Sequence, residues 1–414
     1  MIPKNLIKLT RSLSLKNTGN LITTAISLGN YIPVILSANA AIRNMHSKPD
    51  LAWNSEDNPP FDNPEEKMEL LNRVEWLCKQ VIGDPQSLID KMPQAIGREY
   101  QGQWAYYAVS MTVAALSNIS YIYPEYRKLN LSRMSELIDM AMTPTIKLYD
   151  TMKWKEDPID SLGGNKSHMT YLSILAWMIG HYKLTGGDER YDTLYHSLCK
   201  TLYRRMLKRE DMNLPSFPNG IVFLPDMMFT PLALKIYSDL YNGEYIEVVR
   251  KWSELTRVNW IDSRTGLLIS RYYKSGQRKA PCGSYAALNC SCLVSFAEDF
   301  GTEQYIRTKE VFGRVDSTGK YGAILEYLNK SPRIAFNVDV GIIINGMSPT
   351  GTSFILGAAT YLGDWKFRRQ LLNTADKAGG TVNKKGECHY RLAEVMLTGE
   401  AITLAMRTNV KRKY

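Results

Sequence analysis

The chain has 414 residues, of which 44% are hydrophobic and 22% are charged, and 51 Lys and Arg against 41 Asp and Glu give a net charge of +10. This composition excludes a disordered chain, a collagen and a small disulfide scaffold, and no window is apolar enough for a multi-span membrane protein. A basic balance suggests an acidic partner such as nucleic acid, so the location of the excess charge decides what it means.

The excess positive charge lies in the two terminal segments. No acidic residue precedes Asp50, whereas residues 1–49 hold six Lys and Arg, and the last eight residues add four more. The remaining body has equal numbers of basic and acidic residues. We therefore expect no nucleic-acid partner.

Residues 1–48 have the order of an export signal. Basic residues precede the apolar runs 21–28 and 32–36, and Ala38-Asn39-Ala40 has the spacing of a signal-peptidase site. Asn30 and Pro33 interrupt the apolar stretch, which favours a signal peptide over a spanning helix. We expect an exported (periplasmic) or membrane-anchored protein. The alternative is a basic arm on a membrane surface, and a cytoplasmic location stays open.

Residues 49–65 are rich in Pro, Asn and Asp and predict a linker into a folded body at 66–408, which a basic tail at 409–414 follows. The six cysteines are thinly spread, so buried free thiols are expected and a zinc cluster is not.

From residue 66 onward the hydrophobic period is helical, without sustained strand alternation. Links after every second helical segment are short and the others are long, which predicts six helical hairpins closed into an all-α, (α/α)6 toroid. An open α-solenoid scaffold is the alternative, but it predicts self-similar repeats that this sequence lacks. The expected segments are 67–84, 101–118, 132–150, 168–184, 188–209, 226–242, 244–259, 285–299, 302–314, 352–362, 364–378 and 392–408.

In such a toroid the long loops share one mouth, where the N-termini of the inner helices offer free N–H groups and a positive potential. Each loop brings ionisable or amide groups beside glycine. The candidate acids and bases are Glu99, His168, Asp226, Asp339 and His389. The candidate substrate contacts from the same loops are Tyr100, Gln103, Trp104, Asn165, Tyr285 and Tyr390.

Each candidate also has a structural explanation. Glu99 can pair with Arg98, His168 can bond a carbonyl in a first helical turn, and Asp226 after Pro225 has the position of an N-cap. Asp339 needs a partner if it is buried. No Walker A sequence, His-Glu-x-x-His or Cys-x-x-Cys pair occurs, so neither a metal nor a cofactor is expected.

Residues 219–229 (Asn-Gly-Ile-Val-Phe-Leu-Pro-Asp-Met-Met-Phe) and 236–243 (Ile-Tyr-Ser-Asp-Leu-Tyr-Asn-Gly), with the stretch 165–191 before them, resemble the central motif of the linalool dehydratase/isomerase family. The resemblance implies an α/α toroid that acts on a small terpene alcohol by cofactor-free acid–base chemistry. It also implies a site that a neighbouring subunit of a homo-oligomer completes in part. Pro225, Asp226 and Phe229 match the motif residue by residue, which adds Phe229 to the substrate contacts.

The two motif cysteines of that family are absent, because Phe223 and Leu232 stand in their places. Neither side chain exchanges a proton, so the thiol chemistry does not carry over.

Three functions follow from these patterns. The first is a cofactor-independent enzyme that dehydrates or isomerises a small hydroxylated substrate. The second is a carbohydrate-active hydrolase or lyase, which the paired carboxylates and the aromatic rim favour. The third is a non-catalytic scaffold on a membrane surface.

Overall fold

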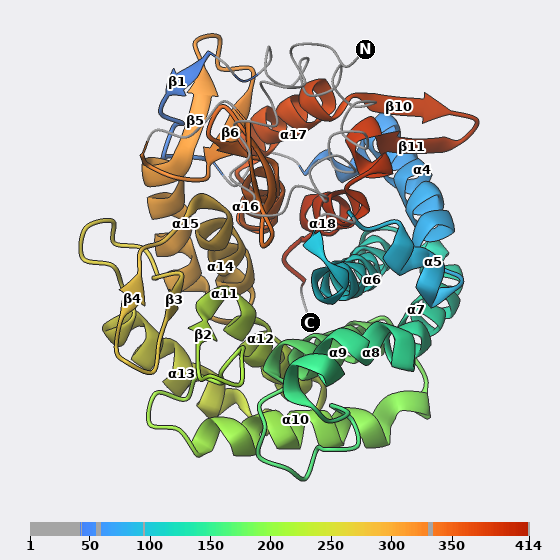
Figure 1. The fold of residues 1–414 in the computed structure, drawn as a ribbon. Helices are drawn as coiled ribbons and strands as arrows, with labels where there is room; N and C mark the ends of the chain where they lie inside the picture. Colours follow the sequence, from blue (N-terminus) through green and yellow to red (C-terminus); the bar gives the residue numbers. More distant parts are fainter. Residues whose placement is uncertain (1–41, 43, 55–58, 94–95, 330–333, 413–414) are drawn as a thin grey trace, which may run out of the picture.

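The computed structural model describes residue 42 and residues 44–54, 59–93, 96–329 and 334–412. Six helices line the inside of a ring (Figure 1). They contact one another in the order in which they occur in the chain, and the last contacts the first, so the cycle closes. Both faces of α9 (Met169–Leu184) and α14 (Gly283–Phe296) are buried, which explains why these two helices are apolar over most of their circumference. The inner helices are α6 (Arg98–Ile122), α9 (Met169–Leu184), α12 (Phe229–Leu240), α14 (Gly283–Phe296), α16 (Pro349–Tyr361) and α18 (Leu397–Arg407).

A second set of helices covers the outside of this ring (Figure 1). Most of them directly follow the inner helix that they contact, and α4, from the N-terminal side, packs on α6 and α18. The outer helices are α4 (Pro64–Val81), α7 (Arg127–Ala141), α8 (Pro144–Trp154), α10 (Asp192–Leu207), α13 (Ile246–Asn259), α15 (Glu298–Phe312) and α17 (Trp365–Gly379). Short helices α5 (Pro85–Asp90) and α11 (Leu224–Met227) lie in the connections.

The predicted helical fold is confirmed, but the prediction of a chain without strands is wrong. The long loops carry strands of two to four residues, which are too short to show a period of two. Some of these strands form local hairpins, and others pair with distant parts of the chain. One antiparallel sheet has the order β1-β5-β6-β9-β8-β7. Its strands are β1 (Met45–Ser47), β5 (Gly313–Asp316), β6 (Gly322–Leu325), β9 (Met347–Ser348), β8 (Gly341–Ile344) and β7 (Ile334–Asn337).

Two smaller sheets complete the loops. Strands β2 (Val222–Phe223), β3 (Arg271–Tyr272) and β4 (Arg278–Lys279) form one of them, and β10 (Thr381–Lys384) and β11 (Glu387–Tyr390) form a hairpin.

The predicted helix 132–150 is two helices in the structure. The first, α7, ends at Ala141, and Pro144 begins α8. The side chain of Thr143 accepts a hydrogen bond from the backbone N–H of Ile146 and caps the second helix. A Thr-Pro pair after an apolar stretch is a start signal for a helix, and it overrides the continuous apolar pattern.

Most of the predicted signal or anchor segment, residues 1–48, lies outside the described residues. The described remainder includes β1, which pairs with β5. In the predicted linker, Trp53 packs edge-on against Tyr305 and donates a hydrogen bond to the carbonyl of Leu362. Within the residues that the structure describes, no helix is long and apolar enough to cross a membrane.

The C-terminal positive charges are docked in the fold as far as the structure describes them. The Arg407 guanidinium is buried and pairs with Glu66 and Glu69 of α4. Arg412 donates a hydrogen bond to the hydroxyl of Ser117 on α6. The predicted basic tail at 409–414 thus contacts the folded body through Arg412. All six cysteines are buried and free, as predicted.

Candidate functional site

One pocket lies at the end of the ring where the inner helices begin. Its empty space, measured out to its mouth, is about 940 Å³. The walls come from the first turns of α6, α14, α16 and α18, from α11 just before α12, and from the turn between β7 and β8. Six predicted site residues from four separate segments meet here: Tyr100, Gln103, Trp104, Asp226, Tyr285 and Asp339.

Asp226 lies in the first turn of α11, directly after Pro225, and is partly exposed to the pocket. Thr170 on α9 donates a hydrogen bond to its Oδ2 atom over 3.3 Å. Burial raises the pKa of Asp226 to about 6, and the negative charge of Asp339 acts in the same direction. The positive charge of Lys153 opposes both effects without cancelling them. This carboxyl group therefore changes its protonation near neutral pH.

Asp339 lies in the turn between β7 and β8, and its side chain is exposed in the mouth of the pocket. Its Oδ2 atom accepts a hydrogen bond from the Tyr285 hydroxyl over 3.1 Å, and its backbone N–H donates to Asn337. The surrounding protein raises the pKa of Asp339 by removing water, while the Tyr285 bond and the charges of Arg271 and Lys153 lower it. The net shift of the Asp339 pKa is upward.

Two cations stand over aromatic rings of the pocket wall. The Lys153 ammonium lies 4.6 Å from the ring centre of Phe217, and the Arg271 guanidinium lies 4.8 Å from that of Phe223. Among the described residues, neither cation forms an ion pair with a carboxylate; each is held by its aromatic neighbour. Sequence reasoning missed both, because nothing in the chain marks a lysine at the end of α8 or an arginine on β3 as neighbours of the site.

The remaining walls combine aromatic with aliphatic side chains. Trp104 donates a hydrogen bond from its indole nitrogen to the Val338 carbonyl, which ties α6 to the turn that carries Asp339. Burial raises the pKa of the Tyr285 hydroxyl, and the charge of Asp339 adds to the increase. The Tyr285 hydroxyl therefore stays protonated at neutral pH and keeps donating to Asp339.

A buried carboxyl group that the sequence did not reveal lies behind this wall. Glu326 follows β6 and is fully buried. It accepts hydrogen bonds from the hydroxyl (2.9 Å) and the backbone N–H (3.3 Å) of Ser284, in the first turn of α14. Burial raises the pKa of Glu326. At Gly283 an added Cβ would lie 1.7 Å from the Leu325 carbonyl oxygen, so only glycine allows this close approach of helix and strand.

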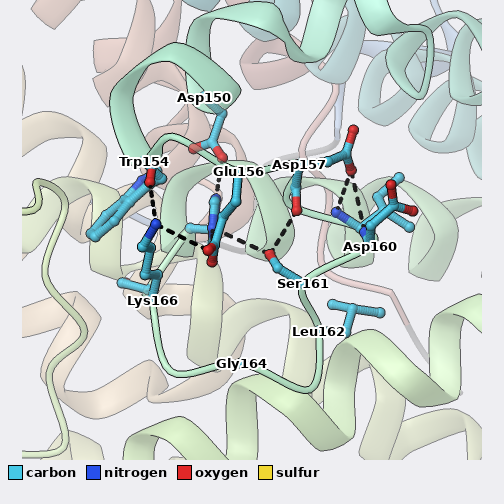
Figure 2. Close-up of polar contacts among 12 residues, drawn as sticks. Asp150, Trp154, Glu156, Asp157, Asp160, Ser161, Leu162, Gly164 and Lys166 are labelled. Carbon is cyan, nitrogen blue, oxygen red and sulfur yellow. Dashed lines mark hydrogen bonds and ion pairs between the residues drawn. The ribbon is translucent and has the colours of Figure 1, made fainter.

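His168 does not line the pocket, contrary to the expectation that it enters the mouth. Its imidazole is fully buried, with Nδ1 bonded to Asp150 and Nε2 to Glu156. Figure 2 shows Asp150 of α8 pointing toward Glu156 and Ser161 of the loop between α8 and α9. Lys166 joins this cluster through the Glu156 carboxylate and the Trp154 carbonyl. With both ring nitrogens engaged, His168 braces this loop.

The two predicted residues of β11 lie on the outer side of the ring. His389 stacks on Trp76 of α4, with ring centres 4.2 Å apart, and bonds to Glu394. Tyr390 lies under the guanidinium of Arg73. The hairpin β10–β11 packs on α4, which takes both side chains away from the pocket.

Glu99, Asn165 and Phe229 also lie outside the pocket lining. Glu99 is half-buried in the first turn of α6, and Asn165 accepts a hydrogen bond from Lys208 on the surface. Phe229 is buried deeper in the ring, edge-on to Tyr107. No cluster of three or more His, Cys, Asp or Glu side chains suited to a metal ion occurs in the described part of the chain.

Comparisons with known proteins add little to this geometry. No family model matches the chain, and no curated protein matches it. The chain is similar to a solved glycoside hydrolase of family 105 from C. acetobutylicum ATCC 824, at 13% sequence identity. The similarity covers 72% of this chain and 92% of that chain, with a TM-score of 0.41. At this TM-score the likeness carries no argument about activity, which rests on the site itself.

Proposed function

We propose that the protein is a carbohydrate-active acid–base enzyme. It cleaves a glycosidic bond of a substrate that is bound between the carboxyl groups of Asp226 and Asp339. The observation that carries the proposal is the pair itself. Two carboxyl groups from separate segments face one aromatic pocket, and each has a raised pKa. Two such groups, one as acid and one as base or nucleophile, are what glycoside cleavage requires.

Asp226 is the general acid in this proposal. It is the carboxyl group with a pKa of about 6, so near that pH a large share of it carries the proton that the leaving oxygen needs. As the bond between the anomeric carbon and that oxygen breaks, the Asp226 proton moves to the oxygen. Thr170 holds the carboxyl group in place from α9.

Asp339 is the general base. Its ionised form is favoured by the Tyr285 hydrogen bond and by the charges of Arg271 and Lys153. These interactions offset part of the free energy that loss of water costs the carboxylate. Its carboxylate takes a proton from the water that attacks the anomeric carbon.

The aromatic walls support a sugar ring as the group that is bound. Trp104, Tyr100 and Tyr285 offer flat apolar surface, and Gln103 adds an amide within the same lining. Pockets of this composition bind ligands that have both apolar faces and hydroxyl groups. The closed cycle of inner helices supports classing the ring as an α/α toroid with loop-borne strands.

The lining also argues against the thiol chemistry of the linalool dehydratase/isomerase family. Phe223 lines the pocket where that family has a cysteine, and the described lining includes no cysteine. Membership of that family stays a prediction, and a dehydration here depends on the same two carboxyl groups. Export or membrane anchoring and assembly into a homo-oligomer also stay predictions.

The test is turnover of a panel of disaccharides and alkyl glycosides, whose leaving alcohols need a proton, by the wild type and by Asp226→Asn and Asp339→Asn. Each variant is expected to lose about 10²–10⁴-fold in kcat, the usual contribution of one positioned acid or base. Asp160→Asn is the matched control, because Asp160 is exposed in the α8–α9 loop and does not line the pocket. Full turnover by Asp226→Asn would contradict the proposal. A wild type that cleaves no glycoside but dehydrates alcohols would replace the sugar substrate with an alcohol.

A further inference from the structure

A second empty space lies between the helices and the six-stranded sheet. It measures about 880 Å³ out to its opening and is bounded by α17, α18, β8 and β9. The lining is almost wholly apolar and includes Ile342, Ile344, Met347, Ala375 and Ala378. None of these five residues lines the pocket that holds Asp226 and Asp339, here called the acid pocket.

This chamber is the gap between two separate hydrophobic clusters. The main core fills the ring of helices, whereas Met45, Ala323, Ile342, Ile344 and Met347 belong to a second cluster on the sheet. Protein interiors are packed as densely as organic crystals, and voids much larger than a water molecule are few. A large apolar gap between two clusters is therefore a place where an apolar ligand gains contacts that the protein does not make by itself.

Most polar groups around the chamber already have partners, whereas the buried Tyr390 hydroxyl has none among the described residues. The Glu400 carboxylate is paired with Arg73 and accepts the backbone N–H of Tyr390. Ser353 and Thr403 bond to each other over 2.8 Å. A hydrocarbon ligand can thus fill the chamber without stripping water from an unpaired charge.

The chamber and the acid pocket are neighbours. Thr350, Met396 and Gly399 line both of them. Gly399 presents no side chain, and the Met396 methyl group lies against Gly341, where an added Cβ would approach it to 2.7 Å. Methionine is an adaptable apolar side chain, and Met396 lies at the boundary that the two spaces share.

We infer that the chamber binds a linear alkyl or acyl chain whose sugar head lies in the acid pocket, which makes the substrate an amphiphilic glycoside. This inference rests on the proposed function for the head and on the chamber for the tail. Each methylene group that enters an apolar site raises affinity about fourfold. Affinity is therefore expected to climb with chain length for as long as the chain stays inside the chamber.

The test measures binding of methyl, butyl and octyl glucosides below their micelle concentrations by calorimetry. The variants are Ala375→Phe and Ala378→Phe, which fill the chamber from α17, and Lys377→Phe is the control because Lys377 is exposed on the same helix. The wild type and the control are expected to bind octyl glucoside at least a hundredfold more tightly than methyl glucoside. Both filled variants should lose most of this gain and bind methyl glucoside as the wild type does.

Two outcomes overturn the inference. One is an equal chain-length gain in the wild type and in both filled variants, which places the chain elsewhere. The other is a wild type that binds methyl glucoside without any gain for octyl, which shows that the chamber admits no ligand.

A separate measurement distinguishes failure of the head from failure of the tail. If no glucoside binds, 1-octanol is tested for displacement of an anilinonaphthalene dye. Displacement from the wild type but not from the filled variants would support the chamber as a binding site for an alkyl chain. The proposal that the acid pocket binds a sugar would then be wrong. Equal displacement from all of them overturns the chamber as well.

Discussion

Replacing Asp226 by asparagine is expected to stabilise the protein at neutral pH while it lowers kcat about 10²–10⁴-fold. The folded-state pKa of Asp226 is about 6 against an ordinary value of 3.8, a difference of about two units. The folded protein then holds the proton more tightly than the unfolded chain does. The free energy of unfolding therefore falls as the pH rises from 3.8 through 6. At 1.36 kcal/mol per unit the full loss is about 3 kcal/mol, of which about 2 kcal/mol falls between pH 4 and pH 7.5.

Urea unfolding of the wild type and of Asp226→Asn at several pH values measures this difference. Asparagine does not titrate, so the stability of the variant relative to the wild type is expected to grow by about 2 kcal/mol from pH 4 to pH 7.5. Asp160→Asn should show no such growth, because Asp160 is exposed outside the pocket. A stability difference for Asp226→Asn that is the same at both ends of this range refutes burial as the cause of the raised pKa.

Three further variants separate catalytic from structural roles. Tyr285→Phe removes a hydrogen bond that lowers the pKa of Asp339. The acidic limb of the pH–rate profile should therefore move to higher pH, with kcat reduced about tenfold. An unmoved limb would exclude Asp339 as the base. Arg73→Met leaves the Glu400 carboxylate buried without its ion pair and should lower the free energy of unfolding by about 3–5 kcal/mol in urea; a loss under 1 kcal/mol would contradict the pairing. His168→Gln should lower the free energy of unfolding by about 1–3 kcal/mol and leave kcat unchanged under conditions in which the variant is folded. A loss of kcat without a loss of stability would instead indicate that His168 is catalytic.

Part of the site was predictable because it follows from chain order. The apolar period places the inner helices, and short links after alternate helices put their first turns on one side. Residues at or just before those turns then share a mouth, and this reasoning found Asp226, Tyr285 and Trp104. Asp339 belongs to another of these loops, and the structure places it in a turn between two strands.

Other parts depend on tertiary contacts that leave no local trace. The loop strands form ladders too short for a periodic pattern, and some of them pair across longer separations, as Phe223 does with Arg271. Lys153 and Arg271 reach the site from an outer helix and from β3. His168 was misjudged because its partner Asp150 lies 18 residues earlier, at a position whose sequence context gives no sign of an imidazole.

The raised pKa of Asp226 shows which force dominates at this end of the ring. An acid in the first turn of a helix is ordinarily stabilised in its ionised form by about 0.3–1 kcal/mol, which lowers its pKa. Here the net shift is upward by about two units, equivalent to about 3 kcal/mol, although Thr170 and Lys153 also favour the anion. Loss of water around the carboxyl group must therefore outweigh all three. The aromatic walls that would hold a sugar are also the walls that exclude this water, so the binding surface and the proton affinity of the acid are set by the same side chains.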